Sequence, residues 1–505
     1  MNKGKKSVLN AATAMIQMVV VSILGLVLTR TIITKYGSDY NGINSTVNQI
    51  VNAIMVLEGG FTLASNVALF SPFSSGNHDE VNAVLAATSK RFKTVGVIAL
   101  AIGIAFAFVF PVMVSSSMPA WMISMLMITV LLPSCFNLGI TMRYRVLILT
   151  DQREYIISVI NTVTYILGCV SAIFIMNAGK TLLTARMLIA VSLFLCYFGI
   201  IAYCRYRYPW HSFSEKPAFD KIKGTKSVLV LKLTSMFYMS FPIIVISTLP
   251  DNGTMIASVY AVYRSVITVV SNGLASLTNA PRLGFGALFA EGRMDDAEAF
   301  FYQYEKITCI ALSAVLGTTC LLLMPFVELY TSGINDISYI DMKMAAIMLF
   351  TVLFETLHIP SGQMIQMKGD FAASRKIQSI SCIVLVVAMA IGRIVFGIYG
   401  IISAVLLAAV VIALMEIFYT GRYIFNRSVA GFLKNTIPCI LICVITMYIG
   451  FAGIIHCSSY IMFVIEGIIA LSACFLVTAG LNYIVDMQGM KAVTKKVMAT
   501  LRRGR

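Results

Sequence analysis

Charged residues are scarce in this 505-residue chain. Asp, Glu, Lys and Arg make up only 12% of it, whereas 59% of the residues are hydrophobic and the mean hydropathy is +0.87. A soluble domain has roughly a quarter charged residues. Because no soluble fold can bury so much apolar surface, most of the chain is predicted to lie in a lipid bilayer.

Motifs for nucleotides, metals and nucleophilic catalysis are also missing. The loops contain no phosphate-binding loop, no dinucleotide fingerprint, no metal-ligand cluster and no nucleophile elbow. The 11 cysteines show no paired metal-ligand spacing and lie almost all in apolar segments, so we expect packed, reduced thiols. These absences argue against an enzyme, against a metal or cofactor, and against ATP-driven transport by this chain alone.

Long apolar runs predict an all-α polytopic membrane protein with about fourteen transmembrane helices. The predicted spans are residues 8–30, 43–69, 94–115, 119–142, 155–177, 182–204, 228–249, 254–279, 307–330, 343–366, 377–397, 399–421, 435–455 and 459–484. The first run is longer than the core of a signal peptide and no convincing cleavage site follows it. We therefore expect it to be kept as a membrane span.

The basic residues are spread along the chain instead of forming one patch. The formal net charge is +16, but Lys and Arg stand between the apolar spans, so nucleic acid is not expected as a partner. Of the 38 Lys and Arg residues, 30 fall on one side of the predicted topology. Four more lie within spans, and the loops on the opposite side hold only Arg30, Lys35, Lys180 and Lys343. We predict a multi-pass protein of the bacterial inner membrane, and the positive-inside rule predicts that both its termini lie in the cytoplasm.

The chain is predicted to contain two related halves. Residues 1–204 form an N-terminal six-helix lobe, 205–227 a cytoplasmic linker with two prolines, and 228–421 a C-terminal six-helix lobe. Residues 422–484 add two transmembrane helices, and residues 485–505 form a basic cytoplasmic tail.

An internal sequence match supports this division. At an offset of 216, the first of two segments contains Phe73, Gly76, Asp79, Glu80, Ala83 and Lys90. The second contains Phe289, Gly292, Asp295, Asp296, Ala299 and Lys306. Each segment joins the second and third spans of its half, which favours duplication.

Two predicted spans carry polar stripes at three- and four-residue spacing. The second span presents Asn41, Asn44, Ser45, Asn48 and Asn52, and the eighth presents Tyr260, Arg264, Thr268, Ser271 and Asn272. Such stripes can simply hydrogen-bond neighbouring helices. Their length and the arginine in mid-span favour a polar, substrate-binding cavity instead.

A few charges lie deep within spans, where they are costly. Arg186, Lys232 and Arg393 are near span ends and are expected to extend to the interface. Arg264 is central, as are Glu58 and Glu355. Arg264 either pairs with one of these acids or forms a cationic cavity wall, with a carboxylate nearby to exchange protons or cations. His358, one turn after Glu355, is a candidate proton relay or a packed histidine hydrogen-bonded to its neighbour. Glu416 and Glu466 are weaker candidates because they lie nearer to span ends.

Several short motifs resemble the polysaccharide flippases of the multidrug/oligosaccharidyl-lipid/polysaccharide exporter superfamily. They are Leu28-Thr29-Arg30, Tyr36-Gly37-Ser38-Asp39-Tyr40-Asn41-Gly42, Leu57-Glu58-Gly59-Gly60-Phe61 and Asp151-Gln152-Arg153-Glu154-Tyr155-Ile156. The resemblance implies a V-shaped pair of six-helix lobes that alternates between inward- and outward-open states. It also implies a lipid-linked substrate, undecaprenyl-diphosphate-linked oligosaccharide, held in a cationic cavity. Arg30 lies in a family motif, and Arg264 and Lys232 are assigned to this cavity from topology and polarity. Membrane lipid, a glycan polymerase and glycosyltransferases are the implied partners.

Other functions remain open at this stage. A multidrug or cation antiporter of the same superfamily is expected to have acids in its first helices, and the first span has none. A non-transporting scaffold has no need of a mid-membrane arginine or of paired polar stripes. A lipid II flippase would use the same cationic cavity and is not distinguished from a polysaccharide flippase. Arg30 also has a second interpretation, as an anchor at the membrane interface.

Overall fold

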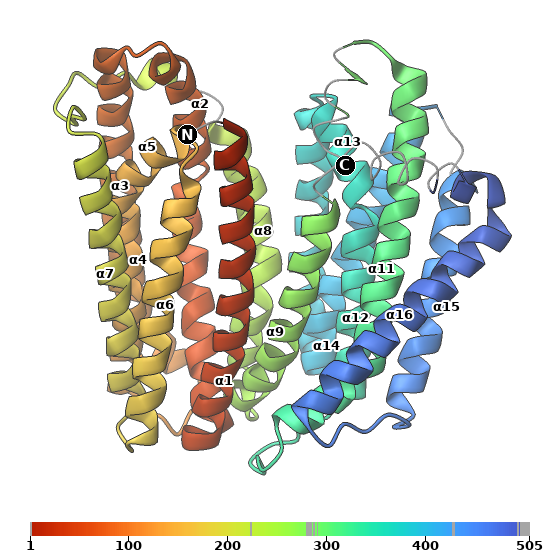
Figure 1. The fold of residues 1–505 in the computed structure, drawn as a ribbon. Helices are drawn as coiled ribbons and strands as arrows, with labels where there is room; N and C mark the ends of the chain where they lie inside the picture. Colours follow the sequence, from red (N-terminus) through yellow and green to blue (C-terminus); the bar gives the residue numbers. More distant parts are fainter. Residues whose placement is uncertain are drawn as a thin grey trace. The chain divides into compact units, whose positions relative to one another are not determined.

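Helices make up all the regular structure in the part of the chain that the computed structural model describes, which is residues 3–222, 225–278, 285, 288–289, 291–426, 430–491 and 494 (Figure 1). The predicted basic tail beyond residue 494 and most of residues 279–290 lie outside these residues. The longer helices are α1 (Lys3–Met55), α2 (Phe61–Ser74), α3 (His78–Met113), α4 (Ala120–Phe136), α5 (Met142–Thr150), α6 (Glu154–Asn177), α7 (Leu182–Arg207), α8 (Thr225–Ser247), α9 (Gly253–Thr278), α11 (Met294–Tyr330), α12 (Met342–Leu357), α13 (Ile359–Met367), α14 (Phe371–Tyr419), α15 (Ala430–Phe451) and α16 (Tyr460–Val485).

Twelve helical segments among the described residues are long and apolar enough to cross a membrane. The sequence predicted about fourteen spans, and two unusually long helices account for the difference. One covers Lys5–Ser74 and the other Phe371–Ile424, with 70 and 54 residues. Each contains a glycine in a non-helical conformation. Gly37 (φ 88°) lies between two predicted spans, and Gly397 (φ 57°) is the last residue of the predicted span 377–397. The predicted all-helical membrane fold is confirmed, and the chain is a multi-pass membrane protein.

The chain reverses direction at both glycines. A Cβ atom on Gly392 would lie 2.6 Å from the carbonyl oxygen of Gly400, so the two arms of α14 pass each other in backbone contact. In α1, Asn10 donates to the Gln152 carbonyl in the loop before α6, and Tyr36 donates to the Lys180 carbonyl in the loop after α6. The first arm of α1 therefore runs the length of α6, as Figure 1 also shows. Glycine is favoured at these reversals because it adopts positive φ without steric cost.

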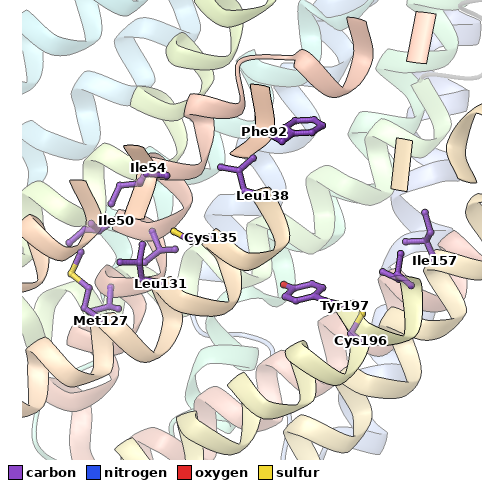
Figure 2. Close-up of a cluster of buried hydrophobic side chains, with 14 of the residues drawn as sticks. Ile50, Ile54, Phe92, Met127, Leu131, Cys135, Leu138, Ile157, Cys196 and Tyr197 are labelled. Carbon is purple, nitrogen blue, oxygen red and sulfur yellow. The ribbon is translucent and has the colours of Figure 1, made fainter. Parts of the chain in front are cut away.

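The chain divides into two compact units. Unit 1 comprises Met1–Ala261 with Ile334–Ile337, and unit 2 comprises Val262–Gly333 with Ser338–Arg505. The core of unit 1 is built from the inward faces of α1, α3, α4, α6 and α7. Figure 2 shows part of this core, with Ile50 and Ile54 of α1 near Met127, Leu131 and Cys135 of α4. A lipid-exposed outer surface and an apolar core together explain why the sequence contains so few charges.

In unit 2, buried polar contacts attach the two C-terminal helices to α11. Lys306 is fully buried and forms a salt bridge with Asp486, which follows α16. The neighbouring Glu305 accepts a 3.0 Å hydrogen bond from Asn435 of α15. A buried charge is tolerated only when it is paired. These pairs therefore specify where α15 and α16 pack on α11.

The segments that match at an offset of 216 have the same local geometry. Gly76 and Gly292 both have φ 71°, and each amide donates to the carbonyl three residues earlier, at Phe73 and Phe289. The next amide in each segment donates to the carbonyl five residues earlier, and a long helix follows, α3 or α11. This is a glycine-terminated helix end, repeated at equivalent places in the chain.

Gly42 permits a close approach of two helices in unit 1. A Cβ atom there would lie 1.7 Å from the backbone oxygen of Thr254, near the start of α9. We expect Gly42→Ala to destabilise the protein by about 1–3 kcal/mol or more, because the obstacle is backbone and cannot rotate away. Thermal unfolding in detergent would measure this. Gly480→Ala is the control, since nothing lies within 4 Å of its added Cβ and alanine favours helix. Equal melting temperatures for the two variants would contradict the prediction.

Candidate functional site

Glu58 lies at a break between two helices within the apolar segment Lys5–Ser74. A short 3-10 turn, η1 (Val56–Glu58), follows α1, and Gly59 and Gly60 then take positive φ values of 59° and 77°. The Glu58 carboxylate accepts a 2.8 Å hydrogen bond from the backbone amide of Thr62, in the first turn of α2. A negative charge is stabilised at a helix N-terminus. The Leu57-Glu58-Gly59-Gly60-Phe61 motif is thus a helix break that carries its own charged cap.

Lys232 of α8 forms an ion pair with Glu58. The carboxylate is largely buried, with 10% of its side chain exposed, whereas 43% of the Lys232 side chain is exposed. An ammonium group has three protons to donate, so the ion pair leaves donors available on the exposed side. The sequence placed Lys232 near a span end, extending to the interface. The structure instead pairs it with the acid predicted to lie in mid-span.

A cavity of about 380 Å³ adjoins this ion pair in unit 1. Its polar lining groups are Gln49, Asn52, Lys232, Ser235 and Ser240, and its apolar ones are Met55, Val56, Met236 and Met239. Ser240 donates a 3.0 Å hydrogen bond to Gln49 across the α1–α8 contact. Amide and hydroxyl groups beside one ammonium suit a polar, anionic ligand, and methionines adapt to irregular shapes.

The polar stripe of α1 has two uses. Asn41 is fully buried and donates a 2.7 Å hydrogen bond to Ser258 of α9, and Asn44 is also buried. Asn48 donates to the Asn44 carbonyl of its own helix. Asn52 is exposed and lines the cavity. The packing interpretation thus describes the Asn41 end of the stripe, and the cavity interpretation describes the Asn52 end.

The other predicted binding residues do not line this cavity. Arg30 is half-buried in α1, and Tyr260 is buried in α9 within unit 1. Arg264 and Thr268 lie farther along α9 in unit 2, where Arg264 is half-buried and Thr268 is exposed. Their roles in binding remain predictions.

A second charged cluster lies in unit 2, where α12 ends and α13 begins. His358 occupies the junction, and its Nδ1 lies 2.8 Å from Oε2 of Glu416 on α14. Only 2% of the Glu416 side chain is exposed, and a Cβ on Gly362 would lie 2.3 Å from that oxygen. Glu355, one turn before His358, places a second negative charge near the imidazole. The sequence suggested a bond between His358 and Glu355, whereas the structure gives His358 a different carboxylate.

Sequence reasoning missed several members of both sites. Gln49, Ser235 and Ser240 were not singled out, although each lines the cavity. The sequence made Glu416 a weaker candidate for a functional charge because it lies near a span end. Its charge inside an apolar segment was the available signal, since such residues mark functional sites. Among the described residues, no group of three or more His, Cys, Asp or Glu side chains is arranged to hold a metal ion.

Comparisons with known proteins show which fold this is. No protein-family model matches the chain, and no curated protein matches it. A solved structure of the lipid II flippase MurJ, in an inward closed conformation, has a TM-score of 0.64 and 13% identity, covering 94% of this chain and 99% of that one. An inward-facing multidrug resistance transporter of the MATE family and MOP superfamily has a TM-score of 0.62 and 13% identity. The match covers 84% of this chain and 95% of that one.

A third similar structure is that of the Vibrio cholerae MATE transporter VcmN, in a mutant form. Its TM-score is 0.55 at 11% identity, covering 82% of this chain and 96% of that one. The matched regions cover 82–94% of this chain and 95–99% of the other chains, so the likeness extends into both units. The chain therefore has the fold shared by MurJ and the MATE transporters of the MOP superfamily.

Proposed function

We propose that the protein is a transporter that moves an anionic, lipid-linked saccharide across the bacterial inner membrane by alternating access. Undecaprenyl-diphosphate-linked oligosaccharide, for surface polysaccharide biosynthesis, is the proposed substrate. The fold shared with MurJ and the MATE transporters supports a transport role. The protein is proposed to act without catalysing a reaction and without a cofactor. Both termini are placed in the cytoplasm by the distribution of basic residues.

The observation that carries the proposal is the position of Lys232. Its side chain is 43% exposed beside the 380 Å³ cavity, yet its ammonium group is held by a buried carboxylate within apolar helices. Glu58 has a second donor, the Thr62 amide, and stays stabilised when Lys232 turns toward a phosphate. The cavity is near the lower end of the range for ligand pockets, which suits a diphosphate and its first sugar while the lipid tail stays in the bilayer.

The remaining predicted residues have proposed roles around this centre. Arg30 and Arg264 add positive charge for the diphosphate, and Asn48, Asn52, Tyr260 and Thr268 bind sugar hydroxyls. Glu58, Glu355 and His358 link transport to an ion gradient. Glycosyltransferases that build the saccharide and a polymerase that uses it are the proposed partners in the pathway.

Two other substrates fit the same fold. Lipid II is favoured by the similarity to a lipid II flippase and also carries a diphosphate, so it would use the same ammonium group. A cationic drug is favoured by the similarity to multidrug transporters. The partly exposed Lys232 side chain argues against a cationic drug, because an ammonium group offers hydrogen-bond donors and no acceptor.

Transport by the purified protein in vesicles distinguishes these substrates. Fluorescently labelled undecaprenyl-diphosphate oligosaccharide, labelled lipid II and a cationic dye would be supplied in separate assays. We expect the oligosaccharide to reach the opposite leaflet at least about tenfold faster than in protein-free vesicles. The same acceleration for lipid II alone would assign the protein to that substrate. Movement of the dye alone would overturn the anionic-substrate proposal.

A further inference from the structure

We propose that a second cavity in unit 1 binds a phosphate ester of the kind carried by phospholipid headgroups. It has a volume of about 240 Å³ and lies where the segment after α7 passes the end of α2 and the start of α3. Phe73, His78, Asp151, Arg207, Tyr208 and Trp210 line it. It shares no lining residue with the cavity beside Lys232, so it is a separate site.

The cavity wall formed by the segment after α7 is held to α3 by hydrogen bonds. Asn82 of α3 donates to the Trp210 carbonyl at 3.3 Å, and its own side-chain oxygen accepts from the Ser212 amide at 2.9 Å. Farther along, the Ala218 amide donates to the Ala83 carbonyl at 3.1 Å. The residues predicted as a linker thus include an ordered part that packs on α3. The cavity is consequently a built feature of unit 1.

Asp151 is the acidic group in the lining, and its charge is already neutralised. It accepts hydrogen bonds from Lys6 at 2.6 Å, from Arg153 at 2.6 Å and from Tyr208 at 2.7 Å. Burial acts to raise the pKa of Asp151, but the hydrogen bonds from Lys6, Tyr208 and Arg153 outweigh burial and lower the pKa. The carboxylate therefore stays ionised and occupied by these donors, and it has little capacity to attract a cationic ligand.

Arg207 supplies the positive charge that a ligand would meet. Among the described residues, no carboxylate lies within salt-bridge distance of the Arg207 guanidinium. The guanidinium carbon lies 5.9 Å from the centre of the Tyr208 ring. Because Asp151 is already paired with Lys6 and Arg153, it offsets little of the Arg207 charge at the cavity. Asp79, in the first turn of α3, does not line the cavity. A guanidinium in this setting favours phosphate, which it binds through two parallel hydrogen bonds.

The aromatic side chains would contact the part of the ligand that is attached to the phosphate. The ring centroids of Phe73, Tyr208 and Trp210 are 6.2–6.4 Å apart, and His78 lies 4.0 Å from Trp210. This wall stands at the ends of apolar helices, where Trp and Tyr typically mark the level of lipid headgroups. A phosphate with an apolar or glycerol portion fits a cation beside aromatic rings. A lipid headgroup and a soluble phosphate ester share this chemistry.

The chain offers a direct optical test, because it has only two tryptophans. Trp121 is 63% exposed, so Trp121→Phe leaves Trp210 as the single reporter in a folded, full-length protein. The protein in detergent would be titrated with dihexanoylphosphatidylglycerol, with glycerol 3-phosphate and with dihexanoylglycerol, which lacks phosphate. We expect a saturable change in Trp210 fluorescence with the phosphate-bearing compounds and none with dihexanoylglycerol.

Two arginine variants in this background complete the test. Arg207→Ala should weaken binding roughly ten- to a hundredfold, the loss typical of a charge-assisted hydrogen bond. Arg205→Ala, in the same helical turn and outside the lining, should bind normally. Binding of the lipid alone identifies a headgroup site, and equal binding of glycerol 3-phosphate identifies a soluble ester. Equal affinities for the two arginine variants, a matching response to dihexanoylglycerol, or no saturable response would each overturn the proposal.

Discussion

Replacing Lys232 with alanine is expected to reduce transport of the lipid-linked oligosaccharide in vesicles roughly ten- to a hundredfold. Lys232 is the exposed cation beside the 380 Å³ cavity, and the loss of one charge-assisted hydrogen bond to a phosphate has about this effect. Lys232→Arg should retain much of the activity, because arginine keeps the charge and binds phosphate well. The measurement is the initial rate of transfer between leaflets at equal protein density.

The alanine variant needs a control for folding. Removing Lys232 leaves Glu58 buried without its cation, and an uncompensated buried charge destabilises a protein. The double variant Lys232→Ala, Glu58→Gln removes that charge as well. It should fold with a normal melting temperature and still fail to transport. A well-folded double variant with the wild-type rate would show that the cation has no role in carrying substrate.

The second large effect is expected at Glu416. Glu416→Gln should make transport independent of a proton gradient, because it removes the buried carboxylate that holds the His358 imidazole. Histidine is the side chain whose ordinary pKa lies nearest neutrality, and this one sits where α12 ends and α13 begins. Mutations in two residues that act as one unit do not have additive effects. His358→Gln should therefore have the same effect, and the double variant Glu416→Gln, His358→Gln should lose no more coupling than either single variant. Glu355→Gln is also expected to uncouple transport.

The measurement compares transport rates in vesicles with and without an imposed pH gradient. Glu466→Gln is the matched control, since Glu466 is another acid within an apolar helix, α16, and its partner is Cys457 instead of a histidine. We expect the control to respond to the gradient like the wild type. If the Glu416 and His358 variants respond in the same way, the cluster does not couple transport to protons.

Much of the fold follows from local sequence patterns. Apolar runs of twenty residues can cross a membrane only as helices, because every backbone amide must be hydrogen-bonded without water. The glycine-terminated turns at Gly76 and Gly292 were visible as a repeated motif, since the glycine and its flanking residues determine such a turn. The kinks at Gly37 and Gly397 separate spans that the sequence had already predicted.

The candidate site was predicted only in part. Periodicity places Asn41 and Asn52 on one helix face, but it does not tell which of them meets another helix. Asn41 packs against Ser258, and Asn52 lines a cavity. Only the neighbouring helix decides between these outcomes, because the cost of a polar side chain depends on what surrounds it.

By itself, the sequence determined that this is a helical, multi-pass membrane protein. It also identified Glu58 as a charge in a costly position, and Lys232 and His358 as candidate site residues. The tertiary structure decided their partners. Lys232 meets Glu58 across 174 residues of chain, and His358 meets Glu416 across 58. Helical periodicity relates residues only a few positions apart. The pairing of distant charges depends instead on which helices pack together, and that arrangement is set by the fit of whole helix surfaces.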